Sequence, residues 1–130
     1  MIFFFTIFSD DIICDCQTVN VISNQDGVQG SVSLVQGTYQ KLGYVNGRTS
    51  WNSSTGAAVW YFPYNEGWFF GPMAGVGGSS VYIVAIWMGN DSCFYDLSGD
   101  QWQYYDSGAS AWTNANVDDV RIQCLSGSFN

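Results

Sequence analysis

The sequence predicts an all-β domain, built as an antiparallel sandwich or a small barrel of short strands and hairpins. Aromatic residues make up 18% of the chain and charged residues only 11%, whereas charged residues are about 25% of an average globular chain. Fifteen glycines supply many turn sites. No stretch combines a helix-capping residue with apolar residues at three- and four-residue spacing, so we expect strands rather than helices.

The first strands of this domain are expected to be half-buried. Val19 and Val21 alternate with polar side chains, which is the pattern of a strand with one face in the core. Val32 and Leu34 show the same alternation and are expected to point inward from a second strand.

The rest of the chain is expected to form hairpins. A strand over 37–45 leads into Asn46-Gly47, a dipeptide that favours a type I′ turn because both central residues need positive φ. The apolar run 81–88 indicates a central strand, and Val120 and Ile122 are expected to face the core from the last strand. The remaining predicted strands cover 57–64, 68–72, 101–106, 111–115 and 117–124, with a long loop over 89–100.

We expect a single domain over 14–130 and a separate apolar strand over 1–13. Residues 2–8 are too short for a membrane-spanning helix, and neither a basic residue before them nor a small-residue cleavage site after them indicates a signal peptide. A strand with apolar side chains on both faces must be covered on both sides. It can fold into its own sandwich or complete the sheet of a neighbouring copy; we favour the second arrangement. The apolar residues of this assembly strand are Ile2, Phe3, Phe4, Phe5, Ile7 and Phe8.

Four cysteines predict two disulfides and an oxidising compartment. Cys14 and Cys16 share one face of a strand, so each is expected to bridge outward, one to Cys124 and the other to Cys93. A zinc site is not expected, because C-x-C lacks the usual two-residue spacing of zinc ligands.

Two N-x-S/T sequons, at Asn52 and Asn90, also fit secretion. Both stand in Gly- and Ser-rich stretches that we expect to form turns. Together with the cysteines, they predict an extracellular, glycosylated protein.

The net charge of −8 argues against several partners. The three basic residues, Lys41, Arg48 and Arg121, are scattered along the chain, whereas nucleic acids and anionic membranes require clustered bases. Arg48 is expected to have a structural role, stacked on an aromatic ring or paired with an acid.

Catalysis is not expected, and we predict no cofactor and no metal. The chain has no histidine, which excludes histidine-activated nucleophiles. Glu66 is the only glutamate, and a glycosidase would need two carboxylates with distinct environments. The loop acids Asp91, Asp96, Asp100 and Asp106 have no feature that sets one apart, and the oxygen-rich stretches 96–100 and 114–119 are expected to be solvated turns rather than calcium loops.

The six tryptophans are the best candidates for ligand contact, although most are expected to pack in the core. Trp68 and Trp112 stand beside predicted turns, so these two are expected to be exposed and available to a glycan. The other four are Trp51, Trp60, Trp87 and Trp102.

Three ordered motifs, over 37–51, 59–72 and 102–124, resemble a small secreted β module that recurs in extracellular proteins of algae, protists and invertebrates. The motifs are GTYQKLGYVNGRTSW, VWYFPYNEGWFFGP and WQYYDSGASAWTNANVDDVRIQC. Thr49 stands where the module often has proline, and the final motif is one residue longer than usual. The resemblance spans about 17–124 and implies secretion, tandem use and structural or adhesive work, with no catalytic residue.

These observations predict a secreted structural subunit that self-assembles into a filament or adhesive matrix through its N-terminal strand, so the expected partners are other copies of itself. The alternative is a carbohydrate-binding module that presents tryptophan and tyrosine side chains to glycans.

Overall fold

The computed structural model describes residues 14–23, 34–79, 81–88, 92–106 and 108–126. The predicted N-terminal strand, Val32 and the sequon at Asn90 therefore lie outside the described residues. Within the described part of the chain, no helix is long and apolar enough to cross a membrane.

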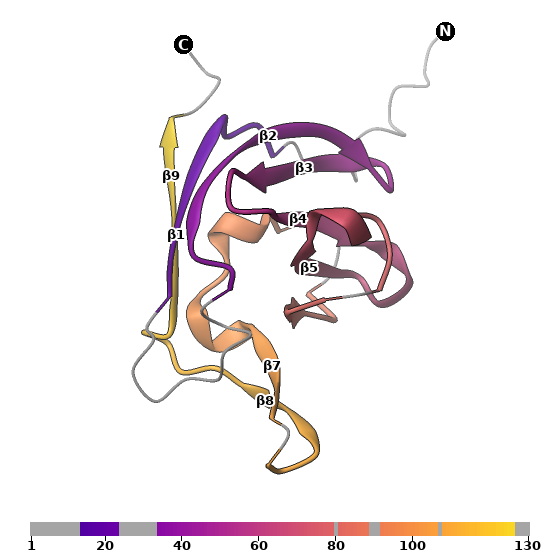
Figure 1. The fold of residues 1–130 in the computed structure, drawn as a ribbon, viewed down its shortest axis with the longest axis vertical. Helices are drawn as coiled ribbons and strands as arrows, with labels where there is room; N and C mark the ends of the chain where they lie inside the picture. Colours follow the sequence, from indigo (N-terminus) through magenta and orange to yellow (C-terminus); the bar gives the residue numbers. More distant parts are fainter. Residues whose placement is uncertain (1–13, 24–33, 80, 89–91, 107, 127–130) are drawn as a thin grey trace, which may run out of the picture.

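The all-β prediction is confirmed, and the architecture is one curled antiparallel sheet that forms a half-barrel (Figure 1). The spatial order of the described strands is β8-β7-β6-β5-β4-β3-β2-β1-β9, and among them only the pairing of β1 with β9 joins strands distant in sequence. The strands are β1 (Thr18–Ser23), β2 (Gly37–Val45), β3 (Arg48–Ser53), β4 (Ala57–Phe62), β5 (Gly67–Pro72), β6 (Ile83–Ala85), β7 (Gln103–Asp106), β8 (Ala111–Asn114) and β9 (Val120–Ser126).

Single-turn 3-10 helices complete the described elements. They are η2 (Pro63–Asn65), η3 (Met73–Gly75), η4 (Phe94–Asp96) and η5 (Gly99–Gln101). Figure 1 shows the segment that carries η4 and η5 inside the curl of the sheet. The predicted long loop over 89–100 thus becomes, over its described part, the filling of the half-barrel.

The predicted Asn46-Gly47 turn connects β2 to β3 with φ values of 54° and 86° at its two central residues. Both values are positive, as a type I′ turn requires. The Asn46 side chain then donates from Nδ2 to the carbonyl oxygens of Tyr61 (2.9 Å) and Gly77 (3.3 Å). The turn therefore also fastens the 73–79 segment to β4.

The inner cluster fills the concave face of the sheet. Strands β3, β5 and β7 supply aromatic rings, and η4 supplies Phe94, whose ring centroid lies 4.9 Å from that of Trp51. Trp51 also donates from Nε1 to the carbonyl oxygen of Cys16 at 2.7 Å. The largest fully buried side chains of the inner cluster are Trp51, Trp68, Trp102, Tyr39, Phe70 and Phe94.

The outer cluster lies on the opposite face of β4 to β6. Its buried members are Ala58, Trp60, Phe69 and Val84, which alternate along the strands with inner-cluster residues. Met73, Val76 and Val81 partly cover this cluster. Trp60 holds the cover in place by donating from Nε1 to the Gly78 carbonyl at 3.1 Å.

Both disulfides form between the predicted partners: Cys14 pairs with Cys93 and Cys16 with Cys124. Each bond ties the segment before β1 to a distant part of the chain, with sequence separations of 79 and 108. The first bond connects this segment to the start of η4 and the second connects it to β9, so both bonds cross-link elements that surround the inner cluster.

Two sequence predictions about strands are wrong. Leu34 is 52% exposed and Val35 is fully buried, because residues 34 and 35 form a turn before β2 rather than a strand. The predicted strand over 81–88 shortens to β6. Beyond it, the main chain of Trp87 and Met88 turns to donate to the carbonyls of Asn65 and Glu66.

Candidate functional site

Strand β9 is one of the two edges of the sheet. It pairs with β1 along one side, and no described strand pairs with its other side. An edge strand presents unpaired N–H and C=O groups and so acts as a template for a further strand. At seven residues, β9 is the longer edge, because β8 at the other end has four.

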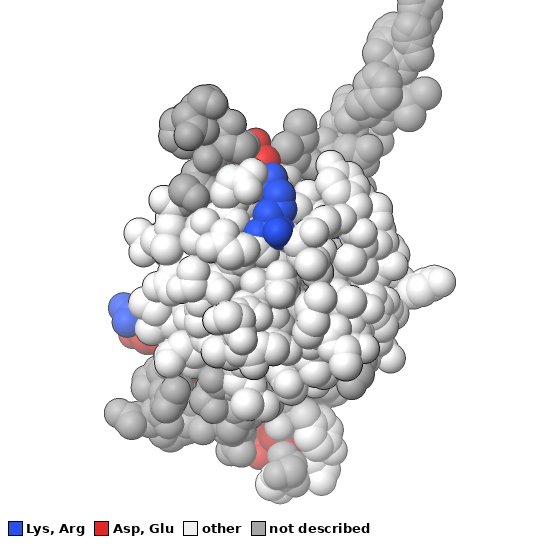
Figure 2. Space-filling view, turned by 45° about the horizontal axis from the view of Figure 1, so that its top comes forward, with Lys and Arg blue, Asp and Glu red and all other residues white. Residues whose placement is uncertain are grey.

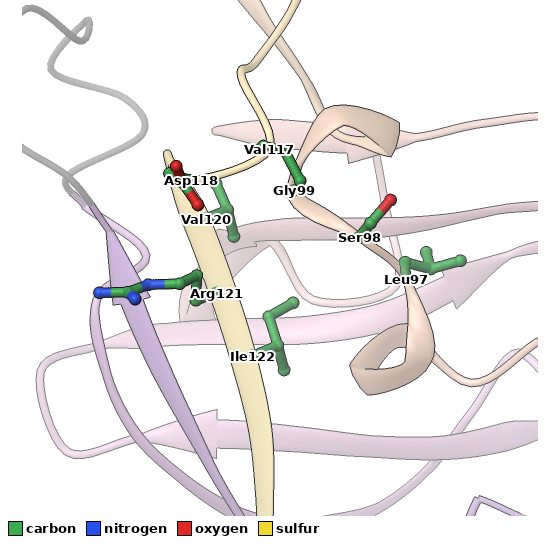
Figure 3. A pocket seen from close by; sticks show the side chains of 8 residues that line it. All are labelled: Leu97, Ser98, Gly99, Val117, Asp118, Val120, Arg121 and Ile122. Atoms are coloured by element: carbon green, nitrogen blue, oxygen red, sulfur yellow. The ribbon is translucent and has the colours of Figure 1, made fainter.

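A hollow of about 300 Å³ lies beside β9, and we refer to it as the edge hollow (Figure 3). Figure 3 shows the Ile122 side chain extending from β9 toward the segment that carries Leu97 and Ser98, whereas the Arg121 side chain points to the opposite side of the strand. The complete lining is Leu97, Ser98, Gly99, Val117, Asp118, Val120, Arg121 and Ile122.

The base of the edge hollow is apolar. Val120 is 1% exposed and Leu97 8% exposed, and Ile122 packs against the inner cluster. The Ser98 hydroxyl donates a hydrogen bond to the Asp100 carboxylate at 2.6 Å. A hollow with an apolar base beside an edge strand is suited to an added strand, since the added backbone pairs with β9 while a side chain enters the hollow.

Gly99 makes the shape of the edge hollow possible. A Cβ on this residue would collide with the carbonyl oxygens of Val117 and Val120. The turn before β9 therefore packs directly on the η5 backbone, and any other residue here would push β9 outward.

A second opening of about 330 Å³ lies on the outer face of the sheet, and we refer to it as the outer groove. Phe69 and Val84 of the outer cluster form part of it, and β7 and β8 contribute one residue each. The complete lining is Phe62, Asn65, Phe69, Ser79, Val81, Val84, Ile86, Gln103 and Trp112.

The two tryptophans predicted to be exposed behave differently. Trp112 is 45% exposed, as expected, and lines the outer groove. The prediction is wrong for Trp68, which is fully buried in the inner cluster and donates from Nε1 to the Ser92 carbonyl at 2.9 Å. Trp68 follows the turn directly, but its side chain points to the concave face of β5.

Sequence reasoning missed Trp87, which is 67% exposed. This residue adopts φ of 61°, a conformation that is costly for a bulky side chain. The sequence does not reveal this exposure, because the continuous apolar run around Trp87 does not show where the strand ends.

The remaining predicted residues have plain structural positions. The Arg48 guanidinium stacks on the Tyr61 ring, with 4.2 Å from its central carbon to the ring centroid, so its predicted stacking role is confirmed. Asn52 lies half-buried within β3 rather than in a turn, which corrects the expected setting of that sequon. Its glycosylation stays a prediction.

Charge is sparse on the described surface. Figure 2 shows a face that is mostly free of Lys, Arg, Asp and Glu, with no basic patch. In the described ranges, no three His, Cys, Asp or Glu side chains gather closely enough to hold a metal ion. The two disulfides are compatible with an oxidising, extracellular setting.

Comparisons with protein-family models, with curated proteins and with solved structures find no match. The similarity of residues 17–124 to a secreted β module is therefore a similarity of motifs alone.

Proposed function

We propose that this chain is an extracellular structural subunit that assembles by adding residues 2–8 of one copy to the β9 edge of the next. The observation that carries the proposal is the position of β9, a seven-residue edge strand beside a hollow with an apolar base.

Length and polarity support this pairing. Residues 2–8 span seven positions, as β9 does, and all but Thr6 are large and apolar. Paired with β9, one row of these side chains faces the edge hollow, where Leu97 and Ile122 offer apolar surface. Burial of such side chains stabilises the contact by about 25 cal/mol for each Å² removed from water.

Insertion into the same protomer is the competing arrangement, and it predicts a monomer. We favour exchange between copies because residues 2–8 precede the stretch that resembles the secreted module and so are surplus to that module. Asp10 and Asp11 follow the apolar run and favour a solvated connection between subunits. Head-to-tail addition that does not close into a ring yields a filament.

Net charge supplies an independent test of assembly. Copies that each carry −8 repel one another in dilute buffer, and salt screens this repulsion. Sedimentation of the full chain should therefore show more assembly as salt is raised. Assembly that dissolves with salt would contradict an apolar contact between like-charged subunits.

Substitutions in the full chain test the two contact surfaces. Phe4→Asp should abolish assembly, because it places a charge in the buried row. Leu125→Lys should weaken assembly at least tenfold, because a lysine on an edge strand disfavours added strands. Leu125 is 52% exposed, so the fold should tolerate this change.

Leu42→Lys is the matched control. Leu42 is 40% exposed, but it lies in β2, which pairs on both sides with β1 and β3. Sedimentation should show wild-type assembly for this variant. Equal effects of the two lysines would indicate association of exposed apolar surface in general, and a monomeric wild-type chain at all concentrations would refute the proposal.

A further inference from the structure

The outer groove has the composition of a binding site for an uncharged ligand. Six of its nine lining residues are apolar, three are polar and none carries a charge. Pockets for small molecules and sugars commonly combine an apolar surface with a few placed polar groups. The polar groups here are the side chains of Asn65, Ser79 and Gln103.

One part of the groove is an aromatic surface already fixed by packing. Phe62 stacks on Phe69 with ring centroids 4.6 Å apart and an angle of 15° between the rings. Tyr64 continues the row, with its centroid 5.3 Å from that of Phe62. Tyr64 is 86% exposed, so the row runs from the buried part of the groove into solvent.

The β7–β8 hairpin contributes a second aromatic pair. Trp112 lies opposite Tyr105 in the hairpin, and their ring centroids are 5.8 Å apart at 75°. Both rings are nearly half exposed, at 45% and 47%. Edge-to-face contact holds the indole without covering it, which leaves part of its surface free for a ligand.

Two amides beside this pair are oriented in advance. Gln103 donates from Nε2 to Asn114 Oδ1 at 3.0 Å, and Asn114 donates from Nδ2 to the Asp100 carbonyl at 2.9 Å. The chain of hydrogen bonds fixes Gln103 at the groove, so little side-chain entropy would be lost when a ligand binds.

Asn65 gives a further sign that the polar side of the groove is incomplete. Its Oδ1 atom is buried without a hydrogen-bond partner among the described residues. Buried polar groups are normally paired, so rotation of this amide toward a ligand hydroxyl would relieve an unfavourable state.

We propose that the outer groove binds a neutral glycan chain. The C–H faces of sugar rings pack on aromatic rings, and their hydroxyls can pair with amides that the aromatic residues surround. An acidic or basic polymer would find no counter-charge there. A wholly apolar segment, including residues 2–8 of another copy, would bury the groove amides away from water without offering them new partners, which is unfavourable.

Tryptophan fluorescence of the full chain tests this proposal, with neutral β-glucan, xylan and mannan oligosaccharides as probes and alginate and heparin as charged comparisons. We expect at least one neutral probe to bind and the charged polymers to bind at least tenfold more weakly. Absence of binding to any neutral probe, or stronger binding of the charged polymers, would overturn the proposal.

Variants locate the site. Trp112→Ala should weaken binding at least tenfold, with partial recovery in Trp112→Phe, and Gln103→Ala should weaken it about fivefold. Trp87→Ala is the matched control, because Trp87 is exposed but does not line the groove; its affinity should stay within twofold of wild type. Loss of binding in the control alone would place the site elsewhere.

Two further measurements separate this proposal from that of assembly. Leu125→Lys should disrupt assembly and leave glycan affinity unchanged. A peptide of residues 1–13 should not compete with the glycan. Competition by this peptide would assign the groove to the N-terminal segment and overturn the glycan assignment, whereas loss of assembly alone would not affect it.

Discussion

Both faces of β4 to β6 carry apolar clusters, but the two clusters are covered in different ways. On the concave face, the inner cluster is filled by the η4–η5 segment and tied by two disulfides. On the convex face, the outer cluster has four buried residues under a short cover that Asn46 and Trp60 hold by hydrogen bonds to Gly77 and Gly78. The thinner cover leaves the outer groove open.

This difference separates stability from binding. A closed, cross-linked cluster can tolerate little change, because interiors are packed as densely as crystals. A partly covered cluster keeps aromatic side chains in place while leaving part of them accessible. We therefore expect substitutions on the inner side to unfold the protein and substitutions on the outer side to change what it binds.

The largest expected effect is loss of a disulfide from the inner side. Replacing Cys16 and Cys124 together with alanine should lower the free energy of unfolding by about 4 kcal/mol, because the open chain regains the entropy of a long loop. Urea unfolding of the double variant measures this change. A loss below about 1 kcal/mol would show that the inner cluster does not depend on its cross-links.

Neighbouring residues of β5 give the sharpest comparison of the two faces. Phe70 is fully buried in the inner cluster, and Phe69 is 4% exposed in the outer cluster beside the groove. Phe70→Ala should cost about 3–5 kcal/mol of stability and Phe69→Ala about 2 kcal/mol, because the space left beside the groove can take up water or collapse. Equal losses in urea unfolding would contradict the distinction between the faces.

Alkaline pH should also act through the inner side. Burial raises the pKa of Tyr39 well above that of a free tyrosine, so the folded state keeps this proton after the unfolded chain has released it. The contribution of the protonated Tyr39 to the free energy of unfolding is therefore fully present below about pH 10, the pKa of an unfolded tyrosine. Above that pH it falls by up to about 1.4 kcal/mol for each pH unit.

Tyr39→Phe should flatten the decline in unfolding free energy above pH 10, at a cost of about 1 kcal/mol near neutrality for the hydrogen bond to the Val35 carbonyl. Tyr44→Phe is the control, because Tyr44 is 81% exposed. If the unfolding free energy of Tyr39→Phe still declined above pH 10 with the wild-type slope, Tyr39 would not be the cause of the decline.

Local patterns predicted much of the fold. The alternation around Val19 and Val21 and the Asn46-Gly47 turn depend on neighbouring residues only, and both are confirmed. The expectation that Cys14 and Cys16 bridge outward to Cys93 and Cys124, with the pairing left open, is also confirmed, although both cysteines lie before β1 rather than within a strand. The alternation and the turn need no knowledge of the rest of the chain.

Features that depend on tertiary contacts were not predictable. A strand apolar on both faces, such as β5, does not reveal which side meets the larger cluster, so the sequence alone does not distinguish a buried Trp68 from an exposed one. The edge position of β9 follows from its pairing with β1, almost a whole chain length away. The outer groove draws on residues from 62 to 112, and in the sequence only the exposed setting of Trp112 indicated it.

Photo-crosslinking tests most directly whether β9 receives the N-terminal segment of another copy. A photoreactive phenylalanine at position 4 of the full chain, in an equal mixture of light and heavy isotope-labelled protein, would mark its neighbours for mass spectrometry. We predict cross-links from position 4 to residues 118–126 that include mixed-isotope pairs. Cross-links confined to same-isotope pairs, or directed to the outer groove instead of β9, would contradict the account.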